Sequence, residues 1–183
     1  MQKSFETLIA ADEPPAFSEA RLHGRSNFVI VVDHASARIP RSLSYLGVPQ
    51  SELQRHIAWD IGALAVARYV SEALDAPMVA QNYSRLVIDC NRDPKVATSI
   101  PTVSESTGIP GNIGLSEEQR LARRAAIFDP YHERIAALLD ERKAACISRR
   151  TPLYMSVMLC CDTRIVGRPA AFRSSRRAAM RSW

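Results

Sequence analysis

"NFVIVVDHAS", residues Asn27–Ser36, is the stretch that most directly predicts the fold. Phe28 to Val32 is a continuous apolar run rich in β-branched residues, which is typical of a strand covered on both faces in a parallel sheet. The run ends abruptly in Asp33 and His34. Because ligand sites of parallel sheets lie beyond the carboxyl ends of the strands, these two residues are the first candidates for a functional site.

Further strands and helices are predicted to alternate along the chain after this strand. Three short apolar runs indicate strands, namely "APMVAQ" (76–81), "SRLVIDC" (84–90) and "PLYMSVMLCC" (152–161). Residues 51–74 predict a helix with Ser51 as its N-cap, and residues 116–148 predict a long helix that Pro130 interrupts. This alternation is typical of an α/β fold with a mostly parallel or mixed sheet flanked by helices.

Length and composition predict one domain between two irregular ends. The chain has 183 residues, of which 46% are hydrophobic, enough for one sizeable core. Residues 1–26, with Pro14-Pro15, are predicted to form an irregular N-terminal arm, residues 27–163 a single α/β domain, and residues 164–183 a basic tail. Residues 93–114, rich in Pro, Ser, Thr and Gly, predict a functional or mobile loop.

The sequence also indicates where the protein works. No apolar run approaches the roughly 20 residues that span a bilayer, and the N-terminus lacks the apolar region of a signal peptide. Four cysteines without CxxC spacing fit the reduced thiols of a cytoplasmic protein. We therefore expect no membrane partner.

The net charge of +5 resides in the tail. Residues 164–183 contain six arginines and no acidic residue, so the rest of the chain is close to neutral. No aromatic platform or reading motif accompanies the charge, which argues against a nucleic-acid partner. Binding of nucleic acid or an anionic surface by the tail alone remains a separate hypothesis.

The segment "NYSRLVIDCNRDP", residues 82–94, combines an apolar run with four polar side chains of interest. Arg85 and Arg92 could bind a carboxylate bidentately, and Asn91 could add a directional hydrogen bond. Asp89 could hold one of the arginines in place. The alternative is a structural network of arginine and aspartate at the end of a strand.

Three further residues each have a functional and a structural interpretation. His34 could bind a metal, with a neighbouring acid orienting its ring, or could form a hydrogen bond to backbone. Asp60, on the predicted helix, needs a metal or basic partner if it is buried, or could form an exposed pair with His56. His132 is most simply a packing residue, because "HERI" lacks the second histidine of the HExxH zinc motif.

Four motifs in the same order resemble those of the N-formylglutamate amidohydrolase-like family: "VVDHASARIP", "HIAWDIGA", "YSRLVIDCNRDP" and "IPGN". The resemblance implies a zinc-dependent hydrolase with the architecture of the zinc carboxypeptidases, which cleaves N-formyl-L-glutamate to formate and glutamate in histidine breakdown. It implies His34 and Asp60 as zinc ligands. It also implies a small-molecule carboxylate substrate gripped by Asn91 and Arg92, with Arg85 supporting them.

The resemblance ends after Val157. The family continues there with a segment whose histidine would supply the third zinc ligand, whereas Met158 stands here. We therefore expect the C-terminal part to be missing or replaced, which leaves the third ligand and the general base unassigned. Asp33, Asp89 and His132 are expected to support the site, and His132 could substitute as a ligand. The alternatives are an active zinc amidohydrolase and an inactive family member that binds carboxylates without metal.

Overall fold

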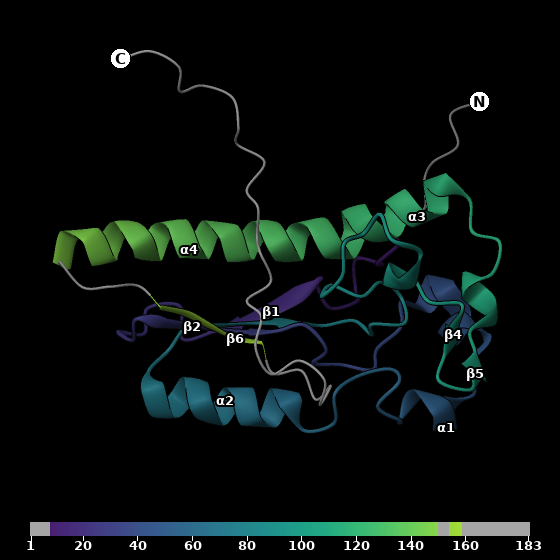
Figure 1. Ribbon diagram of the computed structural model, residues 1–183, viewed down its shortest axis with the longest axis horizontal. Coiled ribbons are helices and arrows are strands. Elements are labelled where there is room, and N and C mark those ends of the chain that lie inside the picture. The colour runs from purple at the N-terminus through teal and green to yellow at the C-terminus, as the bar shows by residue number, and fades with distance from the viewer. Residues whose placement is uncertain (1–7, 150–153, 159–183) are drawn as a thin grey trace, which may run out of the picture.

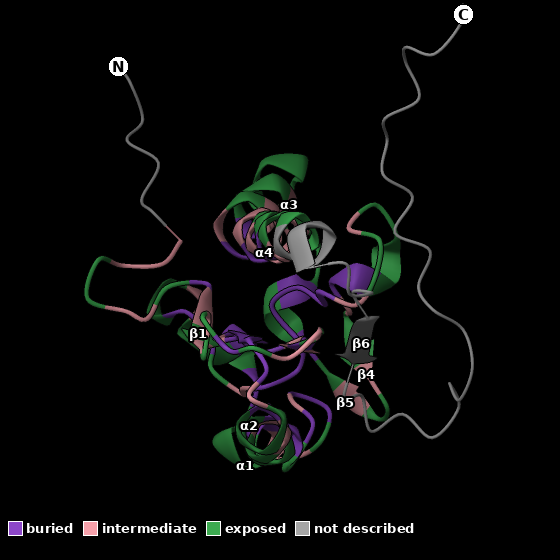
Figure 2. Ribbon diagram, turned by 90° about the vertical axis from the view of Figure 1, so that its left-hand side faces the viewer, coloured by how far each residue is buried: buried purple, intermediate pink, exposed green. Residues whose placement is uncertain are grey.

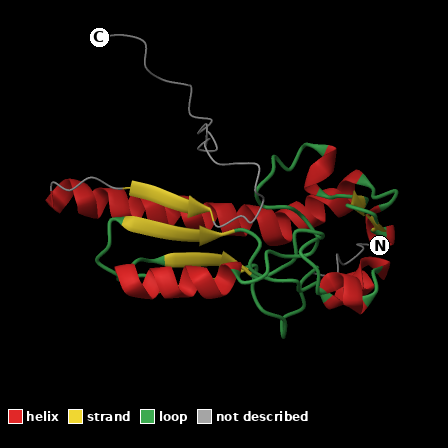
Figure 3. Ribbon diagram, turned by 60° about the horizontal axis from the view of Figure 1, so that its bottom comes forward, coloured by secondary structure: helices red, strands yellow, loops and turns green. Residues whose placement is uncertain are grey.

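Strand β2 (Phe28–Val32) lies inside a four-stranded sheet. In the computed structural model, which describes residues 8–149 and 154–158, β2 pairs in parallel with β3 (Met78–Gln81) and with β6 (Tyr154–Met158). Strand β1 (Phe17–Ala20) pairs antiparallel with β3, which gives the order β1-β3-β2-β6 (Figures 1 and 3). The predicted α/β fold, with a mostly parallel but mixed sheet, is confirmed.

The apolar run of β2 is covered on both faces, as its sequence predicted. Figure 1 shows α2 (Ala63–Leu74) along one face of the sheet and α4 (Asp129–Arg149) along the other. Ile30 and Val32 pack in a cluster with alanines of α2, while Val29 belongs to the larger core that includes Leu138 of α4. Successive side chains of a strand point to opposite faces, so one continuous run serves both layers. Buried residues accordingly gather between the two helices (Figure 2).

The long helix predicted after Ser116 is present in three parts. It comprises α3 (Glu117–Arg123), the π-helical turn η4 (Arg124–Phe128) and α4. Ser116 forms a complete capping box with Gln119, and the interruption predicted near Pro130 is η4, which ends two residues before that proline; Pro130 itself lies in the first turn of α4. None of the helices in the described part of the chain is long and apolar enough to cross a membrane.

The strand predicted for residues 84–90 is wrong. Leu86, Val87 and Ile88 are fully buried, but their backbone forms turns instead of a ladder. The Val87 amide donates to the Ser84 carbonyl at 2.9 Å, and the Asp89 amide donates to the Ser99 carbonyl at 2.7 Å. A short apolar run signals burial more reliably than it signals conformation, and here it fills the core as an irregular segment.

The single helix predicted for residues 51–74 is also wrong. The chain instead forms α1 (Gln50–Leu53), a turn region, and then α2. Ser51 lies within α1, whose N-cap is Pro49. The break occurs because the Asp60 amide donates to the His34 carbonyl at 3.0 Å, and because Gly62 adopts a positive φ of 86° just before α2.

The remaining predictions concern the connecting segments. The arm of residues 1–26 is not wholly irregular, because residues 17–20 satisfy their backbone groups against β3 as strand β1. Residues 93–114 contain four short elements: η2 (Ala97–Ser99), β4 (Val103–Ser104), β5 (Thr107–Gly108) and η3 (Pro110–Asn112). The turn η1 (Arg41–Gly47) contains three consecutive residues with positive φ, Ser44, Tyr45 and Leu46. The basic tail, residues 164–183, lies outside the described residues.

Candidate functional site

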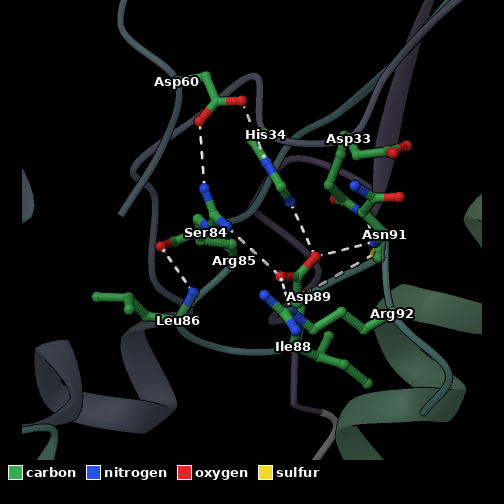
Figure 4. A network of polar contacts seen from close by, with 12 residues as sticks. Asp33, His34, Asp60, Ser84, Arg85, Leu86, Ile88, Asp89, Asn91 and Arg92 are labelled. Atoms are coloured by element: carbon green, nitrogen blue, oxygen red, sulfur yellow. Dashed lines mark hydrogen bonds and ion pairs between the residues drawn. The ribbon is translucent and has the colours of Figure 1, made fainter. Parts of the chain in front are cut away.

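His34 lies at the centre of a buried polar cluster (Figure 4). Its side chain is only 1% exposed. Nδ1 of His34 lies 3.2 Å from Oδ2 of Asp60, and Nε2 lies 2.8 Å from Oδ1 of Asp89. The polar residues that follow Val32 and Ile88 therefore meet, as the sequence predicted, although residues 84–90 form no strand.

Hydrogen bonds from backbone amides and from the Ser84 side chain hold the three segments of the cluster together. The turn that carries Asp60 is bonded to His34 on one side, through the Asp60 amide, and to residues 84 and 85 on the other. Ser84 Oγ donates to the Ala58 carbonyl at 2.7 Å, and the Arg85 amide donates to the same carbonyl at 3.3 Å. Sequence reasoning missed Ser84, which has no signal beyond its position at the start of an apolar run.

The carboxylates determine the charge of His34. Burial alone lowers the pKa of His34, but the hydrogen bonds to Asp60 and Asp89 outweigh this effect and raise that pKa to about 9. Burial has the opposite effect on Asp89, whose pKa it raises. The hydrogen bond from His34 and the positive charges of His34 and Arg85 outweigh burial, so the pKa of Asp89 is lowered. Both carboxylates thus stabilise positive charge between them.

The two arginines predicted to bind substrate lie beside this cluster. Arg85 Nη1 lies 3.2 Å from Asp60 Oδ1, and its Nη2 lies 3.7 Å from Asp89 Oδ2. Arg92 Nε donates to Asp89 Oδ2 at 3.0 Å. The side chains remain 21% and 46% exposed, so each guanidinium is anchored at one edge and partly open to solvent. The backbone N–H of Asn91 donates to Asp89 Oδ1 at 2.9 Å, so Asn91 lies in the same loop as Asp89.

Asp60 does not occupy the position that the sequence suggested. It lies in the turn before α2 instead of on a helix, and its side chain is 4% exposed. It does not pair with His56, which is exposed and bonds through Nε2 to Glu105 Oε1 at 2.8 Å. The exposed-pair alternative for Asp60 is therefore wrong, because its carboxylate is turned inward to His34 and Arg85.

Asp33 and His132 lie outside the His34 network. Figure 4 shows the Asp33 side chain turned away from the His34 ring. Its Oδ1 accepts a hydrogen bond from the Tyr131 hydroxyl at 2.7 Å, and burial raises the pKa of Asp33. His132 Nε2 lies 2.9 Å from the Cys90 carbonyl, to which it donates. Tyr131 was missed at the sequence level, although its place four residues after Ile127 marks the same buried helix face.

The donor set suits a metal only in part. His34 and Asp60 present a ring nitrogen and a carboxylate oxygen to one another. Among residues 8–149 and 154–158, however, no three His, Cys, Asp or Glu side chains are grouped closely enough to hold a metal ion. His132 is therefore not a third ligand in this arrangement.

A sheet between two helical layers, with a buried histidine–carboxylate cluster beyond the end of β2, defines an α/β hydrolase-like protein. Residues 26–153 match the family model described as N-formylglutamate amidohydrolase, and the chain belongs to that family. A crystal structure of the gene product Atu2144 from Agrobacterium tumefaciens is similar, with a TM-score of 0.74 and 41% sequence identity. The match covers 75% of this chain and 55% of the other, so this chain spans little more than half of that relative. Comparison with curated proteins gives no match.

Proposed function

We propose that the protein is a metal-dependent amidohydrolase that cleaves the amide bond of an N-formyl or N-acyl amino acid. Membership of the N-formylglutamate amidohydrolase family supports the reaction class. The observation that carries the proposal is the buried His34, which has Asp60 on one ring nitrogen, Asp89 on the other, and two arginines beside it.

His34 and Asp60 would hold zinc in this proposal. Ring nitrogen and carboxylate oxygen are ligands that zinc accepts, and a carboxylate on the far ring nitrogen is the usual partner of a zinc-bound histidine, a role that Asp89 would fill. Catalytic zinc sites take three protein ligands, and the described residues group no third donor with His34 and Asp60, so the third ligand is unassigned. When bound, zinc activates water and polarises the amide carbonyl.

The arginines would bind the carboxylate of the substrate. A guanidinium is planar and binds a carboxylate through two N–H groups, and Arg85 and Arg92 are each held at one edge by Asp60 or Asp89. This anchoring fixes the arginines before the substrate arrives, which lowers the entropy lost on binding. Asn91, in the same loop, would supply a further hydrogen bond.

The second candidate is a carboxylate-binding protein without metal. The absence of a three-residue metal group among the described residues favours it. In that case the arginines would bind small carboxylates in the presence of a chelator, and no amide would be cleaved. The two candidates therefore differ in metal content and in turnover.

The test measures both quantities on the full-length, untagged chain. Zinc is quantified by elemental analysis, and formate release is followed with N-formyl-L-glutamate and with an N-formyl amine that lacks the carboxylate. We expect about one zinc per chain and formate release only from the carboxylate-bearing substrate, with both lost in His34→Ala. His23→Ala, at an exposed histidine, is the control and should change neither. A folded protein that binds no zinc and releases no formate would overturn the enzyme proposal, and carboxylate binding that persists in chelator would then support the second candidate.

A further inference from the structure

Two consecutive residues of α4 hold the two chain segments that meet at His34. The Tyr131 hydroxyl donates to the Asp33 carboxylate at 2.7 Å, and His132 Nε2 donates to the Cys90 carbonyl at 2.9 Å. Asp33 directly precedes His34, and Cys90 directly follows Asp89. Each α4 side chain therefore fixes the neighbour of one member of the His34–Asp89 pair.

The surrounding residues restrict the side chains of both Tyr131 and His132. Tyr131 is fully buried in the main core, so its hydroxyl has no access to water and is satisfied by the Asp33 carboxylate together with the backbone of Val32. The His132 ring packs against Phe128, with ring centroids 4.2 Å apart, and edge-on against Tyr131 at 5.4 Å. These ring contacts restrict the rotamers of His132, which directs its Nε2 toward the loop of residues 89–92.

The π-helical turn η4 supplies the rotation that this arrangement requires. Before it, Arg123 faces the core and donates to the Val87 carbonyl at 3.1 Å. After it, Tyr131 and His132 face Asp33 and Cys90. A π turn contains one residue more than an α turn, and one residue corresponds to about 100° of helix rotation. In an uninterrupted α-helix, Tyr131 would lie about 80° and His132 about 180° around the axis from Arg123, whereas the extra residue of η4 reduces these angles to about 20° and 80°.

We propose that Tyr131 and His132 are positioning residues, which set the alignment of His34 with Asp89 through the neighbouring residues Asp33 and Cys90. The alignment itself does not depend on the proposed reaction. Its consequence for turnover rests on the proposed function.

The test follows the His34 ring by NMR in full-length protein labelled with ¹⁵N-histidine. The readout is the exchange rate with water of the Nε2 proton that bonds to Asp89, assigned with His34→Gln. We expect Tyr131→Phe, which removes only the hydroxyl, and His132→Leu to accelerate this exchange at least tenfold. His132→Gln, whose amide can donate to the Cys90 carbonyl, should restore a rate close to that of the unchanged protein.

Matched controls separate positioning from general loosening. Tyr69→Phe, at a tyrosine that is 74% exposed on α2, and His23→Leu should leave the exchange rate unchanged. Backbone amides of β2 and β3 report whether each variant is folded. If Tyr131→Phe does not fold, the comparison of His132→Leu with His132→Gln decides whether α4 positions His34.

Unchanged His34 exchange in folded Tyr131→Phe or His132→Leu would overturn the proposal, and so would failure of His132→Gln to restore the rate. In an active enzyme, the same variants should lower kcat more than they raise KM, because Arg85 and Arg92 bond to Asp60, Asp89 and Thr98 and to no described side chain of α4. If no turnover is found at all, the proposed function fails, while the NMR result still decides the positioning role.

Discussion

Asp89 bonds to the far ring nitrogen of His34 at 2.8 Å, while its second carboxylate oxygen accepts a hydrogen bond from Arg92. One buried carboxylate thereby links the candidate metal ligand to a candidate substrate-binding arginine. Loss of its charge should affect both the stability of the fold and the site.

Asp89→Asn tests this link. The amide keeps the shape but removes the carboxylate partner of Arg92 and leaves Asp60 as the one buried counter-charge of His34 and Arg85 among the described residues, so we expect the free energy of unfolding to fall by about 3 kcal/mol. If zinc binds, its affinity should fall about 10-fold to 100-fold. Urea denaturation and metal competition measure the two effects. Asp140→Asn, at an exposed carboxylate on α4, should change neither, and an equal loss in both variants would contradict the assignment.

Replacing Arg123 with lysine should destabilise the protein although the charge is kept. Its buried guanidinium donates to the Val87 carbonyl, to Asn112 Oδ1 at 2.6 Å and to the Gly111 carbonyl at 2.9 Å, and burial lowers its pKa to about 10. A lysine ammonium cannot reproduce this planar fork, so Arg123→Lys should destabilise the protein by about 1–3 kcal/mol.

The neighbouring residue offers the control for this substitution. Arg124 forms a half-exposed pair with Asp129, and Arg124→Lys should stay within about 0.5 kcal/mol of the unchanged protein. Chemical denaturation of both variants makes the comparison. Equal effects would show that the buried hydrogen bonds of Arg123 contribute nothing specific.

The hairpin of β4 and β5 should loosen in acid before the sheet does. The hydrogen bond from His56 lowers the pKa of Glu105, and the hydrogen bond from Thr107 lowers the pKa of Glu52, both from a usual value of 4.5. Carboxyls with a lowered folded pKa stabilise the fold above their unfolded pKa and lose that contribution as the pH falls through the folded value.

Amide hydrogen exchange measures this effect. Below pH 4.5, we expect protection of the Ile109 amide, which donates to the Thr102 carbonyl next to the hairpin, to fall while the amides of β2 and β3 stay protected. Glu105→Gln should reduce the protection at neutral pH and weaken its dependence on pH. Simultaneous loss of protection in hairpin and sheet would instead indicate global unfolding.

Ser44→Gly should stabilise the protein. Ser44 is exposed and has φ 45° and ψ 50°, a left-handed conformation that costs a non-glycine residue roughly 1–2 kcal/mol. Glycine removes this cost but gains freedom in the unfolded chain, so a net gain of about 0.5 kcal/mol is expected. Ser51→Gly, at an exposed serine within α1, should have the opposite sign, with a loss of about 0.5–1 kcal/mol. Thermal denaturation distinguishes the two directions.

The sequence predicted the elements that a local pattern determines, such as an apolar run or a helix cap. The apolar run from Phe28 to Val32 formed the central strand, and the capping signal at Ser116 located the start of a helix. The sequence also placed the polar residues after Val32 and Ile88 at one site, and His34 does meet Asp89, although residues 84–90 form no strand and the rule for strand ends applies to His34 alone.

The failures have a common physical cause. Residues 84–90 are apolar because they are buried, but they satisfy their backbone through turns and a long-range bond to Ser99, which no local pattern records. Asp60 left the predicted helix because its amide bonds to His34, which lies 26 residues earlier. Strand β1 exists through its pairing with β3, which is distant in sequence. Tertiary hydrogen bonds decided all three outcomes.

The π-helical turn η4 holds one residue more than a regular turn, which determines how this helix responds to deletions. Loss of one residue from a regular α-helix turns all later residues by about 100° about the helix axis. Loss of one residue between Arg124 and Phe128 would instead convert η4 into an α turn, so that Tyr131 and His132 keep the sides that they face. We therefore expect a one-residue deletion in η4 to be better tolerated than one within α4.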